Sequence, residues 1–241
     1  MNLPIELILG VTTTMTSLVA ATLGLGGGLL LIAVLPAFMV PAAVIPLHGA
    51  TQLASNLSRL YFSRQYIQWA LLPKFLLGSL VGLALCGTLL VNLPTRYIPV
   101  FIGVYILLTI WSKRFSRFIE GYESFYLAGA LQSGLGLLVG TTGPLATTML
   151  SKMNLDKNQI IATNALFLAS SHCAKIAIFI VAGFAFSEYL QLLLWMIGGA
   201  VLGSFLGTQA RQLISSKAFG VILNLALTFL ALRMLIKVFL A

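Results

Sequence analysis

Acidic residues are scarce in this chain of 241 residues, which holds five Asp and Glu side chains against 14 Lys and Arg. Charged residues together make up 8% of the sequence, whereas a soluble globular domain carries about 25%. Hydrophobic residues make up 59%, and the mean hydropathy is +1.03. This shortage of charge excludes an ordinary soluble domain and predicts a protein that is embedded in a lipid bilayer.

Carboxylates, histidines and cysteines are too few to indicate catalysis or metal binding. The five acids fall at the ends of apolar segments or in loops, so the buried carboxylate of a proton relay is missing. Two histidines and two cysteines do not supply a metal cage or a nucleophile with its base. Cys86 and Cys173 lie in apolar runs, where cysteine packs as a small apolar residue. We therefore expect no metal, no cofactor and no catalytic residue, and an intramembrane enzyme is the least favoured alternative.

The positive charge of the chain is spread along it rather than gathered into one patch. The formal net charge is +9, but the cations occupy short gaps between apolar runs, whereas a nucleic-acid-binding protein clusters them on a solvated surface. Cations in such gaps set the orientation of a membrane protein. The first residues lack the basic region and cleavage site of a signal peptide, so we expect the first apolar segment to remain. The expected partners are the lipid bilayer and a small ligand, with no nucleic acid.

Polar residues divide the sequence into ten apolar segments. These cover residues 5–23, 29–43, 46–63, 70–92, 97–112, 124–139, 144–152, 159–182, 188–209 and 218–239. Most reach the ~20 residues that a spanning helix needs, but those at 29–43 and 144–152 are short and resemble half-helices. The most polar stretch lies near the midpoint. We therefore predict an all-α polytopic membrane protein with a first repeat at 1–112, a cytoplasmic linker at 113–123 and a second repeat at 124–241.

The two halves match each other at an offset of 116 residues. The matching pairs are Gly24 with Gly140, Gly27 with Gly143, Gly82 with Gly198, Gly87 with Gly203, and Arg59 with Lys175. A unit with an odd number of crossings re-enters the membrane the other way up, so we expect inverted repeats of about five helical segments, as in many secondary transporters. If each short segment instead forms a re-entrant hairpin with its neighbour, six full crossings replace ten.

The stretch GLGGGLLLIAVLP (24–36) places four glycines in five positions of an apolar run. Glycine costs roughly 1 kcal/mol relative to alanine inside a helix, so we expect the helix to break there and a new one to begin at about residue 29. A broken backbone is tolerated in a bilayer only where it faces protein or a water-filled cavity. The glycines expected to turn at positive φ and to bring bare N–H groups close to a ligand are Gly24, Gly26, Gly27 and Gly28.

The stretch GTTGPLATTM (140–149) predicts a second break of different composition. Pro144 suits the first position of a new helix, and the residues of the break itself are Thr141, Thr142 and Gly143. Helix N-termini carry about half a positive charge and free donors, so two that face each other make an anion site. The alternative is that the glycines only permit close helix packing, as we expect for Gly199, Gly203 and Gly207.

The segments that follow the two breaks each carry a polar stripe on an otherwise apolar helix. The first stripe consists of His48, Gln52, Ser55 and Arg59, with Asn56 beside it. The second consists of Asn164, Ser171 and Lys175, with His172 beside it. Each half thus places one cation at the same position of a helix, and an ionisable residue inside a span is by default a functional candidate. The alternative is that these cations snorkel to the membrane interface.

The motif GLGGGLL, a second glycine-containing break 116 residues later and two weakly similar halves resemble the sulfite exporter TauE/SafE family of transmembrane anion exporters. The resemblance extends over the whole chain. It implies transport of small anions such as sulfite, organosulfonates or related sulfur-containing and organic anions across a bacterial or archaeal inner membrane. The sequence therefore favours a secondary transporter that binds its anion between the two halves, with the stripe and break residues as the site. A passive channel or facilitator is the alternative, and the direction of transport, its coupling and a homo-oligomer are left open.

The distribution of cations predicts the orientation. If the central linker is cytoplasmic, ten cations lie inside, Arg96, Arg233 and Lys237 lie outside, and Lys175 lies within a span. We expect a reporter fused after Ala241 to be extracytoplasmic and one inserted at residue 120 to be cytosolic. Both reporters on the same side of the membrane would contradict the inverted repeat.

Overall fold

The structure, a computed structural model, describes residues 4–91, 94–121, 123–142, 144–211 and 216–240. Within these ranges the chain forms eleven α-helices and several short 3-10 turns, and no strand. Five helical segments are long and apolar enough to cross a membrane: Ile5–Leu23, Trp69–Leu89, Lys157–Val181, Phe186–Ala210 and Gly220–Val238. The predicted fold class, an all-α polytopic membrane protein, is confirmed.

Among the described residues, five helices precede a short linker helix and five follow it. The first group is α1 (Ile5–Leu23), α2 (Gly27–Val34), α3 (Pro41–Phe62), α4 (Leu72–Val91) and α5 (Ile98–Trp111). The linker contains α6 (Lys113–Glu120). The second group is α7 (Phe125–Val139), α8 (Pro144–Ser151), α9 (Lys157–Val181), α10 (Leu190–Ala210) and α11 (Ser216–Leu240). The two short segments of the sequence correspond to α2, which a 3-10 turn at Leu35–Ala37 extends, and to α8.

Helix α3 is 22 residues long but is not among the five segments that are both long and apolar enough to cross a membrane. Its polar stripe lowers its hydropathy, and that stripe faces the interior of the molecule. The side chains of His48, Gln52, Asn56 and Arg59 are each at most 2% exposed. Because polar groups inside a membrane protein belong to internal sites or pathways rather than to the lipid surface, the polar face of α3 marks an internal site.

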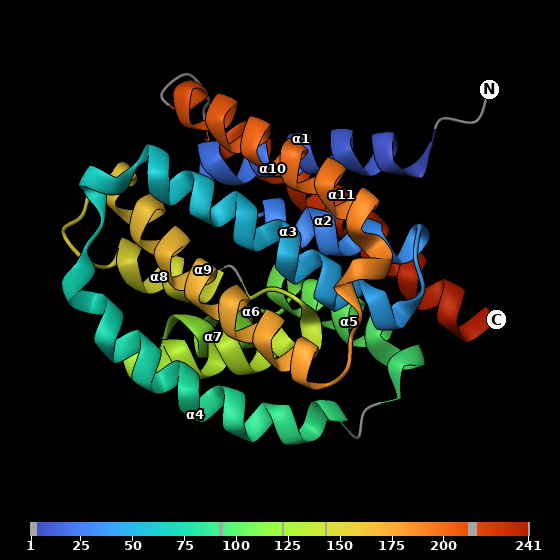
Figure 1. Cartoon of the computed structure of the whole chain (residues 1–241). Coiled ribbons are helices and arrows are strands. Elements are labelled where there is room, and N and C mark those ends of the chain that lie inside the picture. Colours follow the sequence, from blue (N-terminus) through green and yellow to red (C-terminus); the bar gives the residue numbers. More distant parts are fainter. Residues whose placement is uncertain (1–3, 92–93, 122, 143, 212–215, 241) are drawn as a thin grey trace.

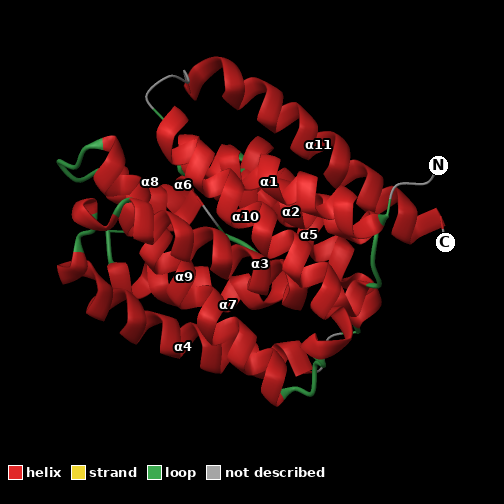
Figure 2. Ribbon diagram, turned by 45° about the horizontal axis from the view of Figure 1, so that its top comes forward, coloured by secondary structure: helices red, strands yellow, loops and turns green. Residues whose placement is uncertain are grey.

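The central helices α3 and α9 lie between two closely packed helix pairs. Helix α1 packs along α10 on one side of the bundle, and α4 packs along α7 on the opposite side (Figure 1). Helices α3 and α9 contact each other between these pairs, and α3 also packs against α10. Helix α11 runs along the outside against α5 and α2 (Figure 2). This arrangement encloses the two helices that carry the polar stripes.

The helix pairing is exchanged between the two halves of the chain. Helix α1 of the first half pairs with α10 of the second. Helix α7 takes the place of α1 in the second half, and it pairs with α4, which takes the place of α10 in the first. A two-fold relation between the halves produces such an exchange. The pairing therefore supports the inverted repeat, which stays a prediction.

Glycine permits the close approach of both outer pairs. A Cβ atom on Gly203 of α10 would overlap the carbonyl oxygen of Thr14 on α1, and one on Gly82 of α4 would overlap the carbonyl oxygen of Ala130 on α7. Small residues let helices in a membrane approach closely and gain van der Waals contact. Gly199, Gly203 and Gly207 all face the α1 backbone in this way, so their predicted packing role is confirmed.

We expect Gly203→Val to destabilise the protein and Gly198→Val to leave its stability unchanged. Overpacking a filled site typically costs about 1–3 kcal/mol, whereas a Cβ at Gly198 meets no atom within 4 Å. Both changes put the same residue into the same helix, so they are matched in helix propensity. Thermal unfolding of the purified variants in detergent is the measurement, and equal midpoints would show that the α1–α10 contact does not depend on glycine.

Candidate functional site

The first helix break lies between α1 and α2. Helix α1 ends at Leu23, and Gly24 and Gly26 adopt positive φ angles of 83° and 89°. Gly27 and Gly28 already belong to α2, which begins two residues earlier than expected. The prediction of a break is confirmed, but the prediction of positive φ at all four glycines is wrong, because two turning residues suffice to reverse the chain and the other two continue as helix.

Gly27 and Gly28 face different surroundings. A Cβ on Gly27 would overlap the carbonyl oxygen of Thr16, so Gly27 allows α2 to pack on α1. A Cβ on Gly28 would instead lie 3.2 Å from Thr141 Oγ1 and 3.4 Å from Gln52 Oε1. Gly27 therefore permits close helix packing, which was the alternative role for these glycines. Gly28 instead borders polar side chains from both halves of the chain.

The second break lies between α7 and α8. Gly140 follows α7 with a φ of 81°, and α8 begins at Pro144, as predicted. Thr141 is 4% exposed and lies against Gly28 of the first break. Gly143, a predicted site residue, lies outside the described residues. The two breaks thus meet inside the molecule.

Side chains of the central helices bind carbonyl groups of the first break. His48 on α3 donates from Nε2 to the carbonyl oxygen of Gly28 at 3.0 Å. Asn164 on α9 donates from Nδ2 to the carbonyl oxygen of Gly24 at 3.3 Å. The carbonyl group of Gly24 follows the C-terminal end of α1, where carbonyl groups lack an intrahelical partner and need one when they are buried. The carbonyl group of Gly28 lies in the first turn of α2. These two contacts hold the first break to both polar stripes.

Arg59 lies at the C-terminal end of α1. Its Nη1 donates to the carbonyl oxygen of Ala20 at 3.2 Å, and its Nη2 donates to Asn56 Oδ1 at 2.5 Å. Asn56 in turn donates to the carbonyl oxygen of Gln52 at 2.6 Å. A cation is stabilised at a helix C-terminus by the helix dipole. Because Arg59 is 1% exposed, it does not snorkel to the surface.

Lys175 holds the corresponding place at the end of α7. Its Nζ donates to the carbonyl oxygen of Gly140 and lies 3.4 Å from His172 Nδ1. The side chain is 2% exposed, so it does not reach an interface either. The two cations that the repeat equates therefore bind the C-terminal ends of the two helices that break.

The described residues of the site include two cations and no acidic partner for them. Within the described part of the chain, the hydrogen-bond partners of Arg59 and Lys175 are carbonyl, amide and imidazole groups. No three His, Cys, Asp or Glu side chains of the described residues lie close enough to hold a metal ion. A buried charge without a counter-charge is costly, so this arrangement favours an anionic ligand.

A small cavity lies where the first break meets α3. Its volume is about 20 Å³, which is room for one water molecule. Residues 24–29 of the break line it together with Ala20, Gln52, Arg59, Thr141 and Leu168. Gln52 Nε2 has no hydrogen-bond partner among the described residues, although the side chain is 2% exposed. The cavity thus brings together the N-terminus of α2, a guanidinium group and an unpaired amide donor.

Two buried imidazole rings lie beside each other near the breaks. The ring centroids of His48 and His172 are 5.8 Å apart with an edge-to-face angle of 69°. Because His172 Nδ1 accepts from Lys175, the neutral ring carries its proton on Nε2, which is an unpaired donor. An unsatisfied buried polar group costs about 1–3 kcal/mol. Such groups gathered in one place indicate a site that a ligand or water completes.

Three predicted site residues have protein partners beside the cavity rather than in it. Ser55 Oγ lies 3.2 Å from Ser204 Oγ on α10, and Ser171 Oγ lies 2.8 Å from Ser133 Oγ on α7. Thr142 Oγ1 donates to a backbone carbonyl oxygen of α7 at 2.9 Å. None of these three described side chains lines the small cavity. Their hydroxyl groups join neighbouring elements around the site.

Two further buried polar residues were not predicted from the sequence. Arg211 is 3% exposed and donates to the carbonyl oxygen of Ala21 at 2.9 Å and to Asn158 Oδ1 at 3.1 Å. In the sequence, Arg211 follows an apolar segment, and we therefore expected it to lie in a cytoplasmic loop. Gln132 in α7 is 1% exposed, and both of its side-chain polar atoms lack a partner. The sequence did offer a signal for Gln132, since an amide side chain in an otherwise apolar membrane helix indicates a buried polar contact.

The family model for the sulfite exporter TauE/SafE matches residues 9–234, nearly the whole chain. The chain belongs to this family. No curated protein and no solved structure matches it. The TauE/SafE match includes both breaks and both polar stripes, so the candidate site lies within the region that the family shares. TauE/SafE membership and the apolar helices make this protein a multi-pass membrane protein of a transporter family.

Gly27→Ala and Gly28→Ala distinguish a glycine that packs against α1 from one that borders the candidate site of this TauE/SafE protein. We expect Gly27→Ala to lower stability by about 1–3 kcal/mol, because its methyl group would overlap the Thr16 carbonyl oxygen. Gly28→Ala requires Thr141 Oγ1 to yield by only a few tenths of an ångström and should unfold near the wild-type temperature. The variants are matched controls for each other in thermal unfolding, and a lower midpoint for Gly28→Ala would contradict this assignment.

Proposed function

We propose that this protein is a secondary transporter that exports small anions such as sulfite, organosulfonates and related sulfur-containing or organic anions. The observation that carries the proposal is the cavity in which Arg59 and the unpaired amide of Gln52 meet the N-terminus of α2. Free N–H groups and the helix dipole favour an anion there, and the guanidinium group adds a charge-assisted donor. Membership of the TauE/SafE family supports an anion-exporter type of transporter.

The anion binds between two inverted repeats in this proposal. The repeats are residues 1–112 and 124–241, the linker at 113–123 is cytoplasmic, and both termini lie outside the inner membrane of a bacterium or archaeon. The contact between Gly28 of one break and Thr141 of the other supports a site shared by the two halves. The exchanged pairing of the outer helices supports the repeat itself.

Arg59 and Lys175 exchange partners when the anion binds. Without an anion, the carbonyl oxygens of Ala20 and Gly140 keep the two buried cations hydrogen-bonded. An oxyanion is a stronger acceptor than a neutral carbonyl group, so it competes for the same donors. No carboxylate is among the described partners of these two cations. The carbonyl oxygens at the helix ends therefore lower the free-energy cost of burying them.

The size of the cavity favours a carrier over a passive channel. A space of about 20 Å³ holds one water molecule and is too small for an oxyanion. The helices around it have to move before the anion enters or leaves. A binding site that opens by such a movement is typical of transporters built from repeats.

Counterflow in proteoliposomes tests the transporter and its site together. Trapped sulfite should drive uphill uptake of labelled sulfite through a carrier, whereas a channel gives no uphill phase.

We expect Lys175→Gln and Arg59→Gln to lower the anion affinity at least tenfold, or ~1.4 kcal/mol, because a charge acts strongly in a poorly screened site. Lys175→Arg should keep part of the activity because it keeps the charge, and Gln52→Leu should weaken binding by removing an unpaired donor.

Lys113→Gln is the matched control, because it removes one cation from the exposed linker helix and should leave the affinity unchanged. Equal amounts of inserted protein are compared in each case. Unchanged affinity in both Lys175→Gln and Arg59→Gln would remove the two cations from the site. Flux without counterflow would identify a channel.

A further inference from the structure

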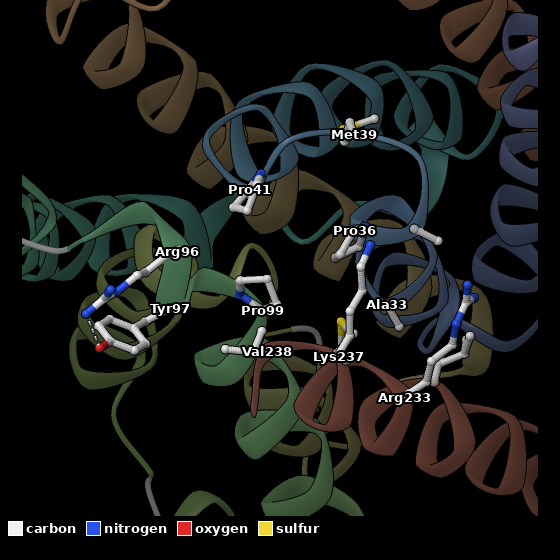
Figure 3. A pocket seen from close by; sticks show the side chains of 13 residues that line it. Ala33, Pro36, Met39, Pro41, Arg96, Tyr97, Pro99, Arg233, Lys237 and Val238 are labelled. Carbon is white, nitrogen blue, oxygen red and sulfur yellow. Dashed lines mark hydrogen bonds between the residues drawn. The ribbon is translucent and has the colours of Figure 1, made fainter. Parts of the chain in front are cut away.

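A second, larger cavity lies where α5 begins and α11 ends, away from the candidate anion site (Figure 3). Its volume is about 660 Å³, within the roughly 300–1,000 Å³ of small-molecule sites. None of its described lining residues belongs to the small cavity between the breaks. A ligand of this cavity is therefore distinct from the anion of the candidate site.

The walls of this cavity are largely apolar. Pro36 and Met39 line it from the connection between α2 and α3, and Pro99 lines it from α5. Leu230 and Met234 line it from α11. Apolar walls favour a ligand with a hydrocarbon portion, because burying apolar surface is the main driving force for such binding.

Three cations also line the cavity. They are Arg96, Arg233 and Lys237, and Figure 3 places Arg96 at one side of it and Arg233 and Lys237 at the other. No acidic side chain of the described residues is among those that line it. Arg96 stacks over the ring of Tyr97, with 4.6 Å from its guanidinium carbon to the ring centroid. The polar part of the occupant is therefore anionic.

Helix α11 contributes both apolar and charged side chains to the cavity wall, and Lys237 lies close to its C-terminal end. Leu230 and Lys237 are seven residues apart, which is about 10 Å along a helix. The outer face of α11 is apolar beside them, with Leu232 46% and Ile236 56% exposed, as expected for a face toward lipid. Lys237 is thus placed where a cation near a helix end reaches headgroup level. Leu230 lies two turns further from that end of the helix.

We propose that this cavity binds an anionic phospholipid. The headgroup phosphate lies beside Arg233 and Lys237, and an acyl chain lies along Pro36, Leu230 and Met234. A free oxyanion would leave the apolar walls uncovered, and a zwitterionic lipid would bring its own cation next to three others. Basic pockets between membrane helices recognise acidic lipid headgroups in this way. The proposal does not depend on which anion the protein transports.

Thermal unfolding in a neutral detergent tests the lipid site. A ligand that binds only the folded state raises the unfolding temperature, so added phosphatidylglycerol should raise it, and phosphatidylcholine with the same acyl chains should not. The double variant Arg233→Gln/Lys237→Gln should bind phosphatidylglycerol at least tenfold more weakly. Its matched control, Lys113→Gln/Arg114→Gln, removes two exposed cations from the linker helix and should respond like the wild type.

Two further arms identify the source of the anion. Ala37→Trp fills an exposed part of the apolar wall without changing charge, and it should also weaken phosphatidylglycerol binding. Glycerophosphoglycerol, the headgroup without acyl chains, should not stabilise the protein. The proposal is overturned if Arg233→Gln/Lys237→Gln responds to phosphatidylglycerol like the wild type, or if the free headgroup stabilises equally. Displacement of the lipid by sulfite would also overturn it, since the cavity would then belong to the transport route.

Discussion

A helix that breaks inside a bilayer leaves backbone polar groups with no water to bind, and the interior of this protein is arranged around that constraint. Asn164 donates to the carbonyl oxygen of Gly24, His48 to that of Gly28, and Lys175 to the carbonyl oxygen that precedes the second break. The N-cap residue of α2 is Gly26, which has no side chain with which to cap the helix. The first break is therefore covered at its carbonyl groups, and the N–H groups at the start of α2 favour an anion over a cation.

The sequence predicted the breaks and the central helices because both depend on local properties. Pro144 fixes the start of α8 through its own backbone geometry, and the stripe from His48 to Arg59 follows from the helical period. The start of α2 was two residues off, because Gly27 and Gly28 can either continue a helix or turn the chain. Only the packing against α1 decides between these two conformations.

Roles that depend on contacts between distant helices were not predictable in the same way. Ser55 belongs to the predicted stripe, yet its hydroxyl group meets Ser204, 149 residues away. Arg211 resembles a loop cation in the sequence, yet it folds inward onto a carbonyl oxygen of Ala21, 190 residues away. Both outcomes depend on how the helices rotate and cross, and helical periodicity does not encode those angles.

The same contacts divide the bundle into two units. Ser55 and Ser204 join α3 to α10, which packs through glycine on α1, while Ser171 and Ser133 join α9 to α7, which packs through glycine on α4. Backbone contacts of this kind leave little room for rearrangement within a unit. The interface between α3 and α9 instead contains two imidazole rings and the flexible stem of Lys175. Helix α9 nevertheless contacts α3 more extensively than it contacts α7 or α4, so the central interface, where both polar stripes lie, also holds the two units together.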